Sequence, residues 1–244
     1  MTEIVKTPFK AKVFRTTAFA SAFLLGSLGT WELSSDLRQP TAIEFPTDRE
    51  RALSIYVKRD AAVSAAEVGL VRGDLWADAA LAYGSLLWTT DEYLSDLDAV
   101  AAERIEALTE RAIRWAPYDA RLWLLLAAIY FAGKSPTEAM SESLAGERLS
   151  ASLKMCYYTG LNTVELIQAR LFLVLRSQSF QDDEIKELVR HDLRIAVARK
   201  AEFTPVIAAA YRSAPQAAKQ YIENALGDLD PEMLKSIRAQ DQSN

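Results

Sequence analysis

The chain of 244 residues is 50% hydrophobic, 25% charged and 9% aromatic. This composition is typical of a folded globular protein and excludes disorder and collagen-like structure. Nine glycines and eight prolines are few for this length, so we expect an all-α protein. The length suffices for one extended domain or two small ones with a hydrophobic core. Cys156 is the single cysteine, which excludes an intrachain disulfide and a multi-cysteine metal site.

The charge is distributed unevenly along the chain. The formal net charge is −5, but residues 1–15 carry four basic side chains against Glu3 and contribute +3, which leaves −8 for residues 16–244. Non-specific nucleic-acid binding requires Lys and Arg clustered on one face, and the sequence shows no such cluster. We therefore expect no nucleic-acid partner.

An uncharged segment, residues 16–31, follows the basic residues 1–15 and is typical of a membrane anchor. As a helix its sixteen residues reach about 24 Å, short of a hydrocarbon core of roughly 30 Å, but Val13 and Phe14 extend it. A cleaved signal peptide is the alternative, although small residues suited to cleavage are poorly placed after the apolar run. A buried helix of a soluble protein is a third interpretation.

The anchor predicts an orientation. By the positive-inside rule, residues 1–15 stay in the cytoplasm and the chain beyond Glu32 lies across the membrane. The Ala- and Arg-rich composition favours a bacterial source. The expected location is therefore a bacterial inner membrane, single-pass, with the helical domain in the periplasm.

Helix start and stop signals organise the rest of the chain. Residues 32–46 carry two prolines and no helical period, and they are predicted to be a linker. Residues 47–239 are predicted to form a helical domain, and residues 240–244 a frayed polar tail. The predicted helices of the first part begin and end at these signals: a capping box at Thr47 to Glu50 with an end near Leu70, Asp74 as a cap, a capping box at Thr89 to Glu92 with an end before Pro117, Asp119 as a cap with an end at Gly133, and Ser135 to Glu138.

Further signals predict helices to the end of the domain. They are an end at Gly160, a capping box at Asn162 to Glu165, a cap at Asp182 or Asp183, short helices at 205–212 and 215–226, and a last start at Asp230 to Glu232. Helices joined by short turns pack most simply as antiparallel hairpins. The arrangement is either a bundle or a solenoid.

The stretch from Ala112 to Tyr130 resembles the junction between two tetratricopeptide repeats. The positions in register are Ala112, Pro117, Trp123, Leu126, Ala127, Tyr130 and, in the next helix, Ala139. Small residues allow paired helices to approach, and the proline stops a helix before the turn. The match covers about one repeat and the end of the one before; Thr109, Ser143 and Ala151 depart from the pattern. The resemblance implies a tetratricopeptide-like α-solenoid.

The resemblance also implies a concave partner-binding face formed by the first helix of the repeat. It places Arg121, Leu124, Ala128 and Phe131 on that face, which is mostly apolar and suits a partner helix or another subunit. Tyr157 and Tyr158 are adjacent near a helix end, so one of them is a further candidate contact residue. The alternative interpretation is that the aromatic side chains fill the core between hairpins.

Few residues are suited to catalysis. His191 is the only histidine and lies in a charged segment, where a solvated or capping role is expected. Cys156 is expected to be a small buried hydrophobe, and Asp182 and Asp183 are expected to cap a helix. No phosphate loop, nucleophile elbow or metal-ligand spacing occurs in the sequence. We therefore predict no catalytic residue, no cofactor and no metal.

These observations predict a non-enzymatic, membrane-anchored periplasmic adaptor that binds protein partners in a cell-envelope complex. By analogy with anchored helical-repeat proteins, polysaccharide assembly or secretion is the first pathway to consider. One alternative is a soluble periplasmic small-ligand-binding or enzyme-accessory domain. The other is a structural subunit of a membrane complex, whose contacts the anchor itself makes.

Overall fold

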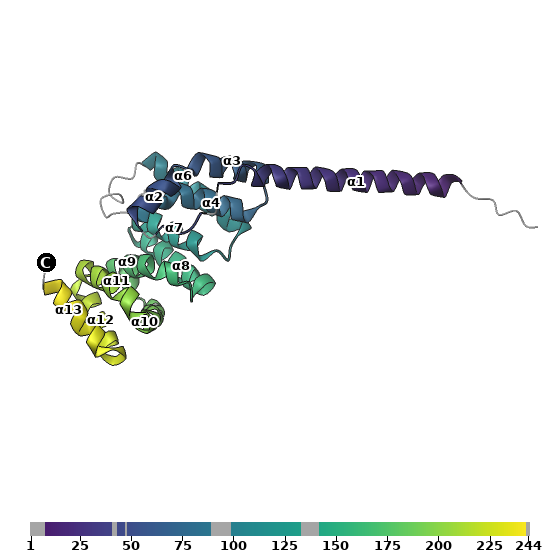
Figure 1. Ribbon diagram of the computed structural model, residues 1–244. Coiled ribbons are helices and arrows are strands. Elements are labelled where there is room, and N and C mark those ends of the chain that lie inside the picture. The colour runs from purple at the N-terminus through teal and green to yellow at the C-terminus, as the bar shows by residue number, and fades with distance from the viewer. Residues whose placement is uncertain (1–7, 41–42, 47, 89–98, 133–141, 243–244) are drawn as a thin grey trace, which may run out of the picture.

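The computed structural model describes residues 8–40, 43–46, 48–88, 99–132 and 142–242 (Figure 1). Within these ranges the chain forms twelve α-helices and three short 3₁₀ helices, and no strand. The predicted all-α fold is confirmed. The helices pack in adjacent pairs, as expected for hairpins.

Helix α1 (Pro8–Asp36) is an arm that projects from the rest of the molecule (Figure 1). It contains the predicted anchor 16–31 and continues through the first part of the predicted linker 32–46. That boundary was therefore wrong, because no proline or glycine interrupts the chain between Trp31 and Asp36. In the described part of the chain, no helix combines the length and the apolar character needed to cross a membrane.

The domain end of α1 is fixed to α3. The indole Nε1 of Trp31 donates a hydrogen bond of 2.6 Å to the carbonyl oxygen of Val68. The guanidinium of Arg72 bridges the carboxylates of Asp36 and Asp74 at 2.5 and 2.6 Å. These contacts come from both sides of the α3–α4 turn, so they fix both the position and the direction of the arm.

The first helices of the domain are α2 (Arg49–Tyr56), α3 (Arg59–Gly69) and α4 (Gly73–Gly84), followed by the 3₁₀ helix η1 (Ser85–Trp88). The sequence predicts one helix from Thr47 to Leu70, but the structure divides it at Val57 and Lys58. Asp48 caps α2 by accepting a hydrogen bond from the Arg51 amide at 2.8 Å. Helix α4 packs against both α3 and α6.

The middle of the domain consists of α6 (Ala99–Trp115), α7 (Ala120–Phe131) and α8 (Glu142–Gly160). Helix α6 ends before Pro117, and Asp119 caps α7 by accepting from the Arg121 amide at 3.0 Å, so both predicted signals are confirmed. A Cβ atom at Gly160 would lie 2.4 Å from the Cβ of Ala120, so glycine permits the close approach of the α8 end to the α7 start. The predicted signals at 89–92, Gly133, 135–138 and Ala139 lie outside the described residues.

The C-terminal helices pack onto this unit. They are η2 (Val164–Leu166), α9 (Ile167–Arg176), η3 (Gln178–Gln181), α10 (Asp183–Ala198), α11 (Lys200–Ser213), α12 (Gln216–Leu229) and α13 (Pro231–Gln242). Asp182 caps α10 and Asp230 caps α13, as predicted. The capping box at Asn162 was wrong, because the Asn162 side chain contacts His191 instead. The predicted tail was also too long, since α13 extends to Gln242.

A single continuous cluster of buried apolar side chains joins the helices from α2 to α13. It begins at Ile43, in the segment after α1, and ends at Ile237 in α13. Helix α7 is central, because it packs against α4, α6, α8 and α9. A helix that is apolar on all sides must be surrounded, and α7 meets this requirement.

Candidate functional site

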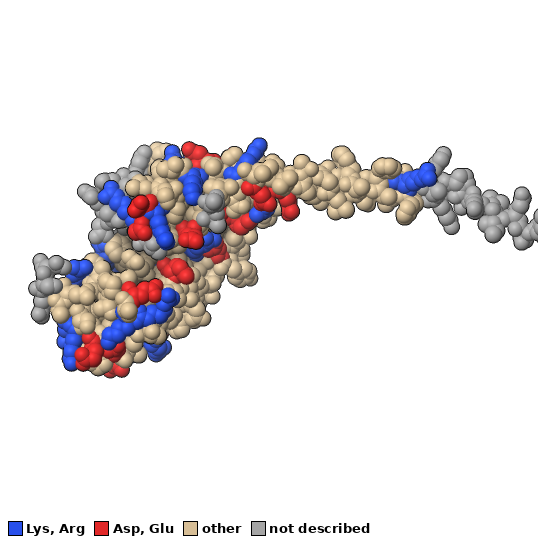
Figure 2. All heavy atoms as spheres, viewed as in Figure 1, with Lys and Arg blue, Asp and Glu red and all other residues tan. Residues whose placement is uncertain are grey.

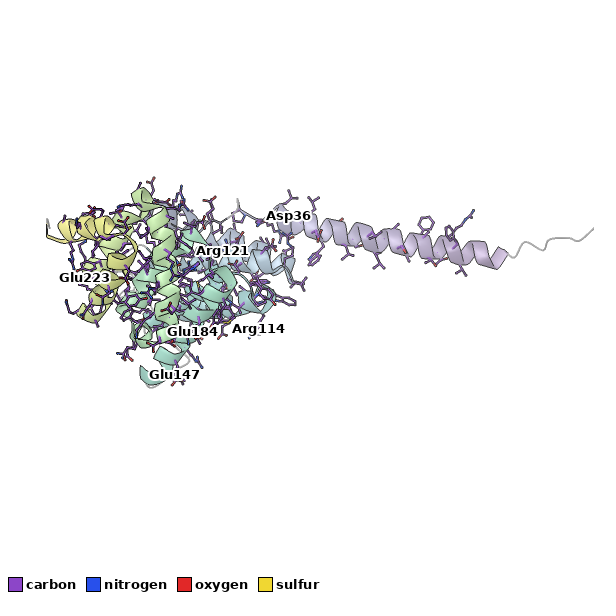
Figure 3. All side chains as sticks on the ribbon, turned by 90° about the horizontal axis from the view of Figure 1, so that it is seen from below. Asp36, Arg114, Arg121, Glu147, Glu184 and Glu223 are labelled. Atoms are coloured by element: carbon purple, nitrogen blue, oxygen red, sulfur yellow. The ribbon has the colours of Figure 1, made fainter. Side chains whose placement is uncertain are left out.

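The face predicted to bind a partner is occupied by the protein itself. Leu124 and Ala128 are both 0% exposed. Arg121 is half-buried, pairs with Asp119 at 2.6 Å, and donates to the carbonyl oxygen of Ile43 at 3.1 Å. Figure 3 shows Arg121 in the middle of the domain rather than at its edge. The segment after α1 and the neighbouring helices therefore cover these residues, and the prediction that they form an open face was wrong.

The other predicted contact residues are only partly accessible. The ring of Phe131 packs edge-on against Phe172 with centroids 6.4 Å apart. Tyr157 is fully buried, whereas Tyr158 is 58% exposed. The hydroxyl of Tyr158 donates to the carboxylate of Glu184, which raises the pKa of that hydroxyl. Of the six predicted residues, Tyr158 alone presents most of its side chain to solvent.

A buried polar cluster lies behind Tyr157. Arg170 of α9 and Asp192 of α10 are both 0% exposed and form an ion pair of 2.8 Å. Arg170 also donates to the Gly160 carbonyl at 2.8 Å and lies 4.5 Å from the centre of the Tyr157 ring. Burial raises the pKa of Asp192 to about 7 against the opposing effect of Arg170. No local pattern in the sequence indicates this pair, because the two residues lie on different helices.

Cys156 is buried as predicted, and desolvation raises the pKa of its thiol to about 12. The thiol is therefore neutral at physiological pH and a poor nucleophile. The half-buried His191 contacts the Asn162 amide oxygen at 3.2 Å. In the described residues, no three His, Cys, Asp or Glu side chains gather as they would around a metal ion. The absence of a catalytic residue or cofactor stays a prediction.

The arm α1 presents large apolar side chains to solvent. Figure 2 shows it as uncharged surface between basic side chains at its far end and mixed charges where it joins the domain. Among the side chains of α1 that the structure describes, from Val13 to Asp36, the exposed large apolar residues are Val13, Phe14, Phe19, Phe23, Leu24, Leu25, Leu28 and Leu33. Because successive helical residues are rotated by roughly 100°, Phe23, Leu24 and Leu25 alone point in three directions. Between Thr16 and Trp31 the arm thus carries no charge and presents apolar side chains in several directions.

A groove of about 770 Å³ lies between α3 and α6. Arg104, Leu108, Arg111 and Trp115 line one wall, and their spacing places them on a single face of α6. Val63 and Glu67 of α3 form the other wall. The buried ring of Trp76 from α4 forms the floor.

Aromatic rings hold two of the groove's arginines. The guanidinium of Arg111 lies 3.9 Å from the centre of the Trp76 ring, and that of Arg104 lies 4.7 Å from the centre of the Tyr83 ring. Arg114 completes the group, and Figure 3 shows it toward the end of the domain from which α1 leaves. In the ranges that the structure describes, these three arginines form no ion pair with a carboxylate.

The arginine groove was not predicted from the sequence. The spacing of Arg104, Arg111 and Arg114, which are separated by seven and three residues, nevertheless indicates a shared face of one helix. Trp115 is 50% exposed beside them, while Trp76 is in the core as the alternative interpretation of the aromatics predicted. A solvent-facing stripe of basic and aromatic side chains is suited to binding rather than to catalysis.

Comparisons of the chain with models of protein families, with curated proteins and with solved structures give no match.

Proposed function

We propose that the protein is a non-enzymatic adaptor, tethered to a membrane through α1, whose helical domain binds a protein partner in the cell envelope. The observation that carries the proposal is the apolar arm. In water, leaving one large apolar side chain exposed forgoes roughly 1.5 to 3 kcal/mol of burial, and α1 exposes eight of them.

The distribution of these side chains favours a bilayer as the surrounding medium. A helix that lies on a membrane surface has one polar face, but α1 carries no charged side chain between Thr16 and Thr30 and exposes large apolar side chains in several directions there. These fifteen residues measure about 22 Å along the helix axis. Basic residues precede the segment and Trp31 follows it, an order typical of the two interfaces of a membrane.

The orientation follows from the charges. Residues 1–15 carry a net charge of +3, which favours retention in the cytoplasm. The domain then lies on the other side, which in a bacterium is the periplasm. The tetratricopeptide-like residues around Pro117 and Trp123, together with the paired helices, support a scaffold for protein partners, with polysaccharide secretion as the pathway to test first.

Vesicle flotation tests the tether. The full-length chain is mixed with vesicles of phosphatidylethanolamine and phosphatidylglycerol and centrifuged through a density gradient in 1 M salt. We expect the protein to float with the vesicles, and the triple variant Phe19→Glu, Phe23→Glu, Leu24→Glu to remain at the bottom, because burying three carboxylates in hydrocarbon is costly.

The control carries the same change away from α1. Val57 and Tyr118 are also exposed, and Val57→Glu with Tyr118→Glu should leave flotation unchanged. If the native chain stays with the soluble fraction, or if both variants lose flotation equally, the tether is wrong.

Cysteine labelling tests the orientation. Cys156 is buried, so the native chain gives little background with a maleimide reagent. Tyr118→Cys introduces an accessible thiol in the domain. A membrane-impermeant maleimide should label this variant in intact spheroplasts; labelling only after lysis would place the domain in the cytoplasm.

A further inference from the structure

We propose that the arginine groove between α3 and α6 binds a short acidic segment of a partner protein. This inference rests on the adaptor part of the proposed function and is independent of the contact between α1 and the membrane. Arg104, Arg111 and Arg114 supply the charge, and Trp115 supplies an apolar surface.

The guanidinium groups of the groove are pre-positioned to bind carboxylates. Arg111 and Arg104 lie against the Trp76 and Tyr83 rings, so their positions are fixed before a ligand arrives. Stacking on a ring leaves the edge of a guanidinium available for two parallel hydrogen bonds to a carboxylate. A pre-positioned side chain loses less conformational entropy on binding than a mobile one.

The charge of the groove limits the size of the ligand. Its lining contains three arginines against Glu67 and Glu110, a net charge of +1. The chain beyond residue 15 carries −8, so most of the domain repels a long polyanion. A short segment with two or three carboxylates avoids this repulsion, whereas a nucleic acid or an anionic polysaccharide does not.

The dimensions also favour a short peptide. From Arg104 to Trp115 the groove follows α6 for about 16 Å, which matches about five residues of extended chain. Trp115 is 50% exposed at one end, where an apolar side chain of the partner can cover it. Tryptophan and arginine are the residues most enriched at the energetic centres of protein interfaces.

The groove lies beside the end of α1 that contacts the domain. Glu67 in its wall directly precedes Val68, whose carbonyl oxygen holds the Trp31 indole. The backbone of Trp115 lies against the start of α4, where a Cβ at Gly73 would be 2.7 Å from the Trp115 oxygen. With α1 in a bilayer, the partner's acidic segment therefore binds close to the membrane surface.

Peptide binding tests the inference. The full-length protein in detergent is titrated against a fluorescein-labelled peptide of twelve residues containing Glu, Leu and Ser, with fluorescence anisotropy as the signal. We expect saturable binding that weakens with salt, and no binding of the same peptide with Lys at every Glu position.

Two variants locate the site. The double variant Arg104→Gln, Arg114→Gln should weaken binding by about tenfold or more, because two charge-assisted pairs are lost. Arg212→Gln removes an exposed arginine of α11 and should leave the affinity within about twofold. Trp115→Ala keeps the charge and should also weaken binding. Arg111 is left intact because it covers the core residue Trp76.

The outcomes that overturn the inference are distinct. Equal binding of the Lys peptide, equal loss in Arg212→Gln, or no saturable binding below millimolar concentration would each exclude an acidic-peptide site. Stronger binding of alginate than of the Glu peptide would assign the groove to a polysaccharide instead. Loss of vesicle flotation with retained peptide binding would remove the tether and leave the groove.

Discussion

The C-terminal helices and helix α6 use their arginines in opposite ways. Arg170 in α9 is fully buried and bound to Asp192 and to backbone carbonyls. Arg104 and Arg111 on α6 are exposed, and each lies against an aromatic ring instead of a carboxylate. Arginine content alone therefore does not identify a binding surface. What matters is whether the fold supplies the guanidinium with a partner.

The largest effect should come from breaking the buried pair. Arg170→Met removes the cation that lowers the pKa of Asp192 and leaves its buried carboxyl group without a partner, and loss of one member of a buried pair costs roughly 3 to 5 kcal/mol of unfolding free energy. Urea unfolding followed by circular dichroism measures this change. Arg170→Met combined with Asp192→Leu should recover much of the loss, because no unpaired polar side chain is then buried. A single variant that costs less than about 1 kcal/mol would show that the pair does not hold the C-terminal helices.

The second effect is a pH dependence in the same region. In the folded chain the pKa of Asp192 is about 7, whereas in the unfolded chain it is about 3.9. The folded state thus binds the proton more tightly, and the contribution of Asp192 to stability falls between about pH 4 and pH 7 by up to roughly 4 kcal/mol. Unfolding free energies at several pH values should show this fall in the native chain but not in Asp192→Asn. Parallel curves for the two proteins would contradict the raised pKa.

The third effect concerns the close contact between the start of α7 and the end of α8, which lie between α6 and the C-terminal helices in the chain. Gly160→Ala places a Cβ atom 2.4 Å from that of Ala120 and 2.9 Å from the Thr163 hydroxyl oxygen. The Ala120 side chain has no alternative rotamer, so α7 and α8 must separate, at a cost of about 1 to 3 kcal/mol. Thermal unfolding measures it, and Gly146→Ala, where the nearest atom is 4.0 Å away, is the matched control. Equal melting temperatures would show that the helices have room to move apart.

The smallest effect should be found on α6. Arg104→Gln with Arg114→Gln removes two exposed charges that form no ion pair among the described residues, so the unfolding free energy should change by less than about 0.5 kcal/mol per site. The same urea experiment used for Arg170 gives the direct comparison. A loss of unfolding free energy as large as that of Arg170→Met would mean that these arginines stabilise the fold and are not free to bind a partner.

Local signals in the sequence predicted some helix starts correctly, but not that of α11, which begins at Lys200 instead of residue 205 and contains Pro205. Asp119, Asp182 and Asp230 cap the helices expected of them, because a cap depends on residues two or three positions away. The break at Val57 and the continuation of α1 to Asp36 were missed. The continuation of α1 could have been predicted locally, because no proline or glycine lies between Trp31 and Asp36. The break at Val57 separates α2, which packs against η1, from α3, which packs against α4, and these partners lie later in the sequence.

The site was harder to predict than the fold. From Leu122 to Phe131 helix α7 is apolar on all sides, which indicates burial, yet the tetratricopeptide resemblance implied a partner-binding face that includes Leu124 and Ala128. The arginine stripe on α6 was readable as one helix face. Whether that face is open depends on where α3 and α4 pack, and no spacing within α6 contains this information.

Helix α1 is continuous from its exposed segment to the residues that contact the domain, so it transmits movement as one rigid rod. No loop lies between the exposed segment and the contacts of Trp31 and Asp36, so the domain cannot swivel while those contacts hold. A tilt of the arm is transmitted to α3 and thus to one wall of the arginine groove. The angle between α1 and the membrane therefore sets the distance of the arginine groove from the membrane surface and the direction in which the groove opens.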